Sequence, residues 1–270
     1  MTGTSPGQRT VPESVSHDAN DGIGVGLRDG VLTVTLDRPQ TLNALTTDML
    51  VGLAKAVDRA AADERVKVLV LRSAGRGFSA GADIGTENAN DGNWSATDVM
   101  DAVSRLIRGI VTLPRPVVAV VRGPAAGLGA SLALACDIVL CSQTAYFVLA
   151  FTKIGLMPDG GATALVPAAV GRVRAMRLAL LAERVAAQEA LDWGLVTALH
   201  ADDVLDTEAD ALIARLAASA STAMAKTKQA INAATLPGLD GALELEERGQ
   251  AQLMASAEFA ERVAAFRNRP

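Results

Sequence analysis

Aromatic side chains, cysteine and histidine are scarce in this chain of 270 residues. Aromatic residues make up 3% of the sequence although 50% of it is hydrophobic, so we expect a core of alanine, valine, leucine and isoleucine. Few rings, a formal net charge of -5 and no block of like charge argue against nucleic acid as a partner. No apolar run approaches the roughly 20 residues that a membrane helix needs, so no membrane association is expected.

The cysteines and histidines are too few for a structural zinc site. Cys136 and Cys141 lie in an apolar stretch, which favours small buried thiols in a reducing cytoplasm. His17 lies in a polar N-terminal stretch, and His200 closes a short apolar run, where a structural role is favoured. Acid–base chemistry in this chain must therefore use a carboxylate, a lysine or a tyrosine.

Strands alternate with helices along most of the chain, and a helical third follows. Residues 1–21 are polar and predict a flexible tail, residues 22–200 predict an α/β core, and residues 201–270 predict a helical C-terminal region. Extended segments are expected at 24–28, 31–36 (joined to the first by an Asp29-Gly30 hairpin turn), 66–71, 116–121, 138–141 and 146–149. Helices are expected at 47–63, 96–112, 128–135, 172–182, 187–193, 203–218, 223–234 and 242–267, and a polar loop at 85–94.

Two turns rich in glycine and alanine follow two of the expected buried strands. The first turn is Phe78–Asp83 and the second is Gly123–Ala130. Small residues leave backbone N–H groups accessible, and two such turns side by side can aim two donors at one oxygen, as in an oxyanion hole. The second turn lacks the third glycine of a dinucleotide fingerprint, since position 132 is Leu132, so no nucleotide cofactor is expected.

A serine hydrolase is an alternative that the context disfavours. Gly77–Gly81 fits a nucleophile elbow around Ser79, and Asp159 and His200 follow in the order that such enzymes use. An elbow lies between a strand and a helix, however, whereas Ser79 is followed by a polar loop.

Asp159 stands out among the acids because its approach, from Ile154 to Met157, is mostly apolar. Pro-Asp-Gly is also ordinary turn chemistry, so a structural role stays open. If the apolar neighbours bury the carboxylate, desolvation raises its pKa and makes it a better base near neutral pH.

These segments, in this order, resemble the crotonase superfamily of enoyl-CoA hydratases and isomerases. The motifs that carry the resemblance are Asp37-Arg38-Pro39, Asn43-Ala44-Leu45, Phe78–Asp83, Pro116–Asp137, Gly155–Gly161, Trp193-Gly194-Leu195-Val196 and Phe266-Arg267-Asn268. The resemblance implies a spiral of ββα repeats, a helical trimerisation region and often a dimer of trimers. It implies acyl-CoA thioester substrates, with coenzyme A as part of the substrate and no separate cofactor.

The resemblance also assigns roles to particular residues. The two oxyanion donors fall on the backbone N–H groups of Ala82 and Leu128. The two glutamates that hydratases use fall on Ser131 and Phe151, so the hydratase pair is absent. Further substrate contacts are implied at Ala80, Asp83, Ile84, Gly127, Ser131, Phe151 and Met157.

Asp159 falls where phenylacetate-pathway isomerases and 4-chlorobenzoyl-CoA dehalogenases carry their acid. The dehalogenases add a histidine and a tryptophan that this chain lacks there, which makes the isomerases the closer match. The sequence therefore favours a Δ3,Δ2-enoyl-CoA isomerase with Asp159 as its acid–base group. Two alternatives stay open: a hydratase that uses Asp159 with a bound water, and a non-catalytic acyl-CoA-binding protein.

Overall fold

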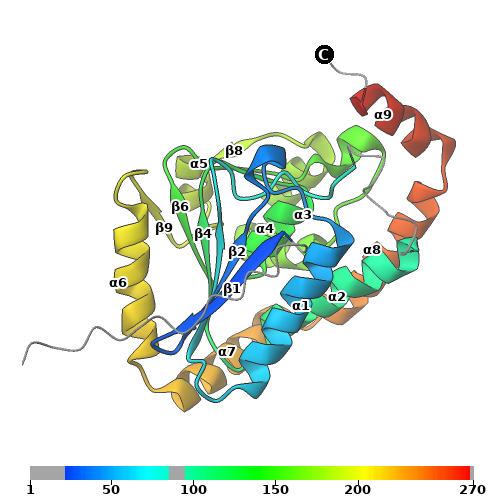
Figure 1. Cartoon of the computed structure of the whole chain (residues 1–270). Helices are drawn as coiled ribbons and strands as arrows, with labels where there is room; N and C mark the ends of the chain where they lie inside the picture. Colours follow the sequence, from blue (N-terminus) through cyan, green and yellow to red (C-terminus); the bar gives the residue numbers. More distant parts are fainter. Residues whose placement is uncertain (1–21, 85–94, 268–270) are drawn as a thin grey trace, which may run out of the picture.

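The computed structural model describes residues 22–84 and 95–267 of the chain. The predicted tail 1–21 and the predicted polar loop 85–94 lie outside the described residues. A six-stranded sheet runs through the centre of the molecule (Figure 1). In spatial order its strands are β1 (Ile23–Arg28), β2 (Val31–Leu36), β3 (Val68–Ser73), β4 (Val117–Val121), β6 (Ile138–Ser142) and β9 (Ala198–His200).

β1 and β2 form the predicted hairpin, and the other neighbouring strands of this sheet run parallel. Asp29 (φ 50°) and Gly30 (φ 79°) make the turn, and positive φ at both residues is what a two-residue hairpin turn requires. β3 pairs with β4, with Leu71 opposite Ala119. Because parallel neighbours end at the same edge of a sheet, the two glycine–alanine turns begin side by side.

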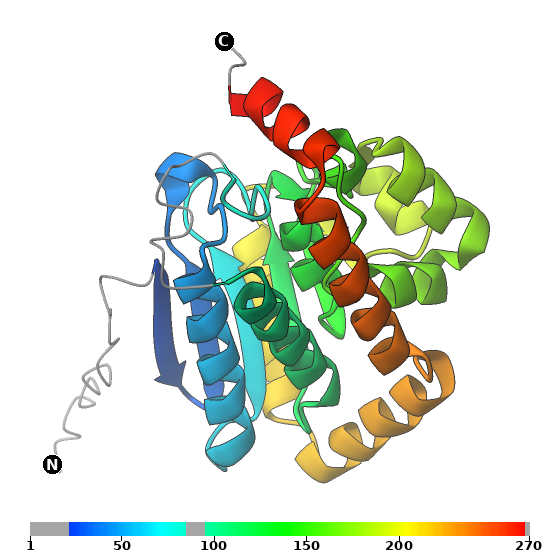
Figure 2. The ribbon, with the colours of Figure 1, turned by 90° about the vertical axis from the view of Figure 1, so that its right-hand side faces the viewer.

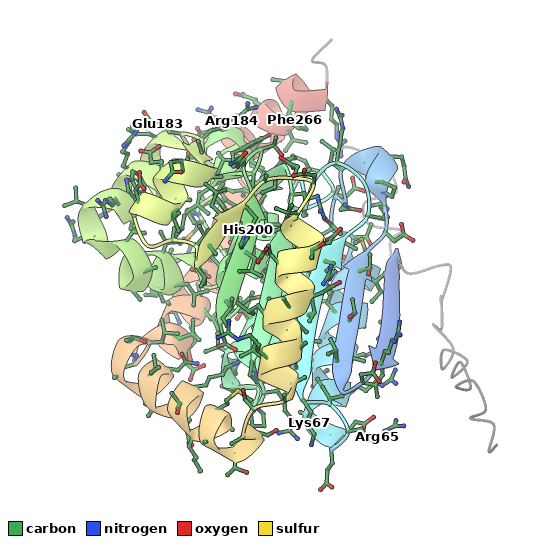
Figure 3. All side chains as sticks on the ribbon, turned by 90° about the vertical axis from the view of Figure 1, so that its left-hand side faces the viewer. Arg65, Lys67, Glu183, Arg184, His200 and Phe266 are labelled. Atoms are coloured by element: carbon green, nitrogen blue, oxygen red, sulfur yellow. The ribbon has the colours of Figure 1, made fainter. Side chains whose placement is uncertain are left out.

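Helices cover both faces of the large sheet (Figures 1 and 3). Successive strand residues point to opposite faces, so Leu69 and Leu71 join the main core, whereas Val68 and Val70 join a smaller core under α6. Within residues 22–84 and 95–267, no helix combines the length and hydrophobicity of a membrane span. The helices here are α1 (Thr47–Ala62) and α2 (Ala96–Thr112) on one side and α6 (Leu205–Ala217) on the other, and the short 3-10 helix η1 (Pro39–Thr41) follows β2.

A smaller, three-stranded sheet begins shortly after the end of β4. Its strands are β5 (Pro124–Ala126), β7 (Tyr146–Val148) and β8 (Val185–Ala186). The helices beside it are α3 (Leu128–Leu134), the 3-10 helix η2 (Ala150–Ile154), α4 (Ala162–Leu181) and α5 (Ala187–Asp192). α3 contacts both β5 and α4, so the second turn packs against the segment that leads into α4.

Three further helices follow α6: α7 (Ser221–Thr235), α8 (Leu239–Met254) and α9 (Ala257–Arg267). α8 runs beside α2 and contacts α4, and α9 contacts η2 (Figure 2). The prediction of one helix over 242–267 is wrong, because the chain breaks between α8 and α9. Ser256 starts the new helix, since its hydroxyl accepts a hydrogen bond from the Phe259 N–H (3.2 Å), as an N-cap residue does.

α4 begins well before the predicted helix of 172–182, which covers only its second half. The first N–H groups of α4 are satisfied by a distant residue. Glu246 on α8 accepts hydrogen bonds from the N–H groups of Gly161 (2.7 Å) and Thr163 (2.9 Å). A negative charge at a helix N-terminus is favourable, so this contact stabilises a start that has no local capping side chain. Gly171 (φ 77°) then kinks the helix.

Candidate active site

The first glycine–alanine turn is held by hydrogen bonds between backbone groups. The Leu45 N–H donates to the Gly81 carbonyl (2.7 Å), and the Asp83 N–H donates to the Leu45 carbonyl (3.0 Å). Ala82 lies between these two tied residues and is exposed. Its N–H donates to no residue within the described part of the chain, so this donor is free to bind a ligand.

The second turn contains a glycine with a positive φ just before α3. Gly127 (φ 51°) immediately precedes Leu128, the first residue of α3. The first N–H groups of a helix have no partner within the helix. Among residues 22–84 and 95–267, none accepts a hydrogen bond from the Leu128 N–H.

The two turns are packed backbone against backbone. A methyl group on Gly81 (φ 95°) would lie 2.8 Å from the Ala126 carbonyl oxygen and 3.5 Å from the Leu128 nitrogen. The Ala126 N–H also donates to the Ser79 carbonyl (2.9 Å). Glycine is needed at position 81 both for its φ and for this close approach. The free N–H groups of Ala82 and Leu128 thus come from neighbouring turns, the arrangement that two donors to one oxygen require.

Asp159 lies on the turn before α4 and is 6% exposed. Ser131 ties this turn to α3, because its hydroxyl donates to the Asp159 carbonyl (2.7 Å). A methyl group on Gly160 would lie 2.8 Å from Leu128 Cδ1 and 2.9 Å from Ser131 Cβ. The acid is therefore packed against the same end of α3 that presents the Leu128 N–H.

Burial raises the pKa of Asp159 to about 7. Gln250 on α8 acts in the opposite direction, since its Nε2 donates to Asp159 Oδ2 (2.6 Å), and the charge of Glu246 raises the pKa further. Asp159 Oδ1 has no hydrogen-bond partner among the described residues. A carboxyl group with a pKa near neutrality can both accept and return a proton near neutral pH.

The enoyl-CoA hydratase/isomerase family matches residues 26–269. The chain belongs to this family. The 1,2-epoxyphenylacetyl-CoA isomerase of Escherichia coli (strain K12) is 41% identical over 241 residues, which cover 88% of this chain and 92% of the relative. A probable enoyl-CoA hydratase of Rhodobacter capsulatus is 41% identical over 240 residues, 89% of this chain and 92% of the relative.

A crystal structure from the same family shares the fold. The enoyl-CoA hydratase from Mycobacterium avium subsp. paratuberculosis K-10 superposes with a TM-score of 0.86 and 54% sequence identity, over 92% of this chain and 96% of that one. These matches confirm the predicted membership of the crotonase superfamily and the predicted α/β fold with its helical C-terminal region.

Ser131 and Phe151, where the resemblance places the two glutamates of hydratases, hold no ionisable side chain. Ser131 is fully buried, and its hydroxyl holds the turn Pro158–Gly161, here called the acid turn, through the Asp159 carbonyl. Phe151 is 6% exposed, and its Cζ would lie 3.9 Å from a methyl group on Gly127. The ring of Phe151 therefore lies beside the second turn as an apolar wall.

Two more of the predicted contact residues, Ala80 and Met157, lie in the first turn and on the approach to Asp159. Ala80 is exposed, and its N–H donates to the Leu42 carbonyl (2.8 Å). Met157 is half-buried on the approach to Asp159. A methyl group on Gly249 of α8 would overlap the Met157 sulfur, so α8 packs directly on this side chain.

Asp83 and Ile84 stabilise the first turn. The Asp83 side chain is 5% exposed and forms an ion pair with Arg38 (2.9 Å). Ile84 is half-buried, and its carbonyl accepts a hydrogen bond from Arg267 Nε of α9 (3.0 Å). The side chain of Asp83 is thus turned toward Arg38, and a substrate contact at Asp83 stays a prediction.

The contacts of Ser79 argue against the serine hydrolase alternative. Ser79 is fully buried, and its hydroxyl donates to the Asn43 carbonyl (2.8 Å) and accepts from the Gly81 N–H (3.1 Å). His200 is half-buried on β9 (Figure 3). No cluster of three or more metal-ligating side chains is found in the described ranges.

Two functional neighbours of Asp159, Glu246 and Gln250, are missed by the sequence reasoning. Both come from α8 and are almost fully buried, at 1% and 0% exposed. A polar pair spaced i, i+4 on a helix usually marks a solvated face, so the sequence gives no sign of their burial. Asn43 is also fully buried, and its amide donates to the Ala74 and Gly77 carbonyls (both 2.9 Å).

The burial of Asp159 predicts a pH-dependent cost in stability. The folded protein holds the proton of Asp159 up to about pH 7, whereas the unfolded chain releases it near its ordinary pKa of about 3.9. The folded state therefore binds more protons between these values, and stability falls as the pH rises through that window. Asp159→Asn cannot ionise, so we expect it to be more stable than the wild type at pH 8, by on the order of a few kcal/mol.

Urea denaturation at several pH values measures this difference. The gain in the Asp159→Asn variant should shrink as the pH approaches 4. The matched control is Asp101→Asn, an exposed acid on α2, for which we expect no such gain. An equal stability of Asp159→Asn and wild type at pH 8 would contradict the prediction.

Proposed function

We propose that this protein is a Δ3,Δ2-enoyl-CoA isomerase. The thioester oxygen of a 3-enoyl-CoA binds between the N–H groups of Ala82 and Leu128, which stabilise the negative charge that develops on it. Asp159 takes a proton from C2, and the electrons of that C–H bond enter a dienolate that extends to C4. The same carboxyl group returns the proton to C4, which leaves the double bond between C2 and C3.

The observation that carries this proposal is the environment of Asp159. It is a buried acid with one unpaired oxygen, and it is packed on the helix that presents the Leu128 N–H. Proton transfer from C2 to C4 needs one group that can be both base and acid. Hydration needs a base for the water and a proton source for C2, and Ser131 and Phe151 supply neither.

The apolar walls suit a dienolate intermediate. Phe151 and Met157 keep water away from the acyl chain, so that the intermediate is not protonated from solvent. Ala80 and Gly127 lie within two residues of the donors in sequence, and we propose that their backbones border the thioester. The 41% identity with a relative named as an isomerase is consistent with this reaction.

A hydratase that uses Asp159 and a bound water is the second candidate. It is favoured by the names of two relatives, an enoyl-CoA hydratase of known structure at 54% identity and a probable one at 41%.

The predicted cytoplasmic location and the predicted independence of a cofactor stay predictions.

Separate assays with 3-hexenoyl-CoA and 2-hexenoyl-CoA distinguish the two candidates. We expect isomerisation of the former and little hydration of the latter. Asp159→Asn should reduce the isomerisation kcat by about 10²–10⁴-fold, because the acid–base group is lost, and should leave thioester binding in place. Asp101→Asn is the control. Hydration as fast as isomerisation, or an unchanged kcat in Asp159→Asn, would rule out the proposed reaction.

Gly81→Ala tests the oxyanion hole without touching the acid. The added methyl group meets the Ala126 carbonyl, so the two turns must move apart. We expect kcat to fall by roughly 10²–10³-fold, the effect of losing one donor to an oxyanion. Gly241→Ala on α8, where a methyl group meets no atom within 4 Å, should keep wild-type activity. A folded Gly81→Ala variant with the kcat of the wild type would contradict the proposed oxyanion hole.

We further propose that copies of the chain assemble through α4, consistent with the predicted trimer or dimer of trimers. Four apolar side chains on its second half are exposed: Val173 (81%), Met176 (41%), Leu180 (65%) and Leu181 (60%). The spacings of three and four residues place Val173, Met176 and Leu180 on one face of the helix, and Leu181 borders that face. An apolar stripe of this kind is typical of a subunit contact.

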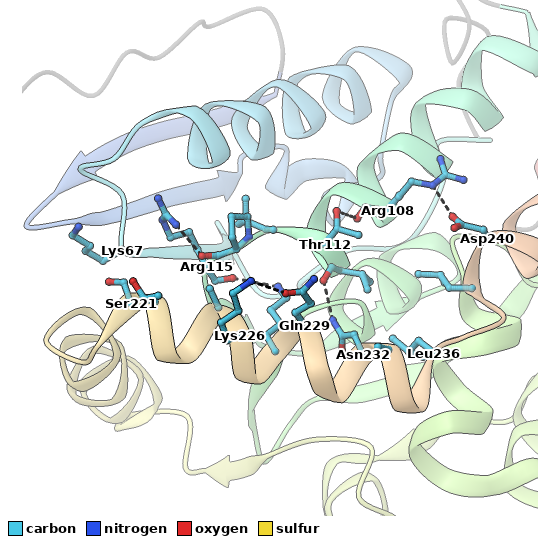
Figure 4. A pocket seen from close by; sticks show the side chains of 18 of the residues that line it. Lys67, Arg108, Thr112, Arg115, Ser221, Lys226, Gln229, Asn232, Leu236 and Asp240 are labelled. Atoms are coloured by element: carbon cyan, nitrogen blue, oxygen red, sulfur yellow. Dashed lines mark hydrogen bonds and ion pairs between the residues drawn. The ribbon is translucent and has the colours of Figure 1, made fainter.

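The surface around α7 offers a second area for such contacts. None of the residues of α7 is buried, and a groove of about 800 Å³ runs between it, the end of α2 and the loop at Arg115 (Figure 4). A smaller groove of about 540 Å³ lies along α7 beside Ile231, which is 55% exposed. Neither groove is lined by Ala82, Leu128 or Asp159.

Sedimentation velocity tests the proposed assembly. Leu180→Lys places a charge in the apolar stripe, so we expect it to shift the protein toward the monomer. Val204→Lys, at an exposed valine that lies before α6, is the control and should leave the assembly intact. A monomeric wild type, or an unchanged oligomer in Leu180→Lys, would contradict the proposal.

A further inference from the structure

Gln250 is the one side chain that hydrogen-bonds to the carboxylate of Asp159 within the described ranges. It is fully buried on α8, and its Nε2 donates to Asp159 Oδ2 at 2.6 Å. Asp159 and Gln250 are 91 residues apart in the sequence, so the contact exists only because α8 packs over the acid turn. Ser131 contacts the backbone carbonyl of Asp159 and leaves both carboxylate oxygens to other partners.

The two oxygens of the carboxylate are therefore unequal. Oδ2 accepts a hydrogen bond from the Gln250 amide, whereas Oδ1 has no hydrogen-bond partner in the described part of the chain. Three buried side-chain polar atoms lack a partner in that part, and two of them belong to this pair: Asp159 Oδ1 and Gln250 Oε1. Buried acceptors are usually satisfied, so two at one place point to a group that arrives with the substrate.

We propose that Gln250 is a positioning residue that holds Asp159 by Oδ2 and leaves Oδ1 as the oxygen that moves the substrate proton. This inference rests on the proposed isomerase function. A proton taken from C2 must be returned to C4 of the same molecule. A carboxylate fixed at one oxygen presents the other in a constant orientation through both steps, whereas a rotating one does not.

α8 is also bound to the acid turn by Glu246, which lies one helical turn before Gln250. Glu246 accepts hydrogen bonds from the Gly161 N–H and from the N–H and hydroxyl of Thr163. Gly249 allows α8 to lie against Met157. The position of Gln250 is thus set by contacts on both sides of Asp159.

The charged group that acts on Asp159 among the described residues is Glu246, which raises the pKa of Asp159. The hydrogen bond from Gln250 lowers it, and Ser131 of α3 is neutral. If Gln250 positions and stabilises the carboxylate, its removal must change the pH at which the base becomes active, because burial and Glu246 then act unopposed.

The pH profile of kcat for 3-hexenoyl-CoA tests this inference. Gln250→Met keeps the length of the side chain and removes the donor. We expect kcat at pH 7 to fall by about 10–100-fold, KM to change by less than about 3-fold, and the acidic limb to move up by about one pH unit. Gln252→Met, at an exposed glutamine on the same helix, should reproduce the wild-type profile.

Gln250→Glu is the second variant, in case Gln250→Met does not fold. It keeps the shape of the side chain but places a second acid against Asp159, so the acidic limb should move further up than in Gln250→Met. A wild-type profile in either variant would overturn the positioning role, because a merely structural residue leaves the limb in place.

The same assay separates this inference from the proposed function. If Asp159→Asn is inactive while Gln250→Met keeps the wild-type pH profile, Asp159 is the acid–base group and only the role of Gln250 is wrong. If Asp159→Asn retains full activity, both proposals are wrong. Inactive Asp159→Asn with a shifted limb in Gln250→Met supports both.

Discussion

Gly81 allows two backbones to meet at the edge of the large sheet, and the site depends on that contact. β3 and β4 are parallel neighbours, so the segments that follow them leave the sheet side by side. A side chain at position 81 would hold those segments apart by about the thickness of a methyl group. The Ala82 and Leu128 N–H groups could then no longer share one ligand oxygen, since catalytic geometry tolerates little displacement.

Features carried by neighbouring residues were predictable from the sequence. A strand followed by small residues identified both turns, and the apolar approach to Asp159 indicated an acid whose pKa burial would raise. These signals are local because backbone conformation and strand burial depend on residues close in sequence. The resemblance to a known family then related the two turns to one another.

Features that depend on packing between distant segments were not predictable. Glu246 caps α4 and Gln250 binds Asp159, yet each is an ordinary polar residue in the pattern of α8. The predicted helix at 172–182 began too late for the same reason. The N-terminus of α4 is stabilised by Glu246, which is distant in the sequence. The break in the predicted C-terminal helix lies at Ser256, which caps α9. The neighbouring residues have a helical pattern, so the sequence did not predict this boundary.

Ser131 makes a structural contact at a position for which the resemblance implies another role. The resemblance places a catalytic glutamate there in hydratases, but here the side chain is fully buried against the acid turn and donates to its carbonyl. A glutamate is longer and charged, so burying it at this position without a partner would carry a desolvation cost that serine does not have. The serine hydroxyl instead ties α3 to the turn that carries Asp159.

The long separation between Asp159 and Gln250 has a consequence for biosynthesis. A ribosome makes the acid turn 91 residues before it makes Gln250, so the nascent chain holds the acid without its amide partner. Contacts between such distant residues close a long loop and form late in folding. Both oxyanion turns can be in place at that stage, but the acid is still open to water. On the proposed mechanism, the growing chain therefore reaches full activity toward thioesters only after α8 has left the ribosome and docked.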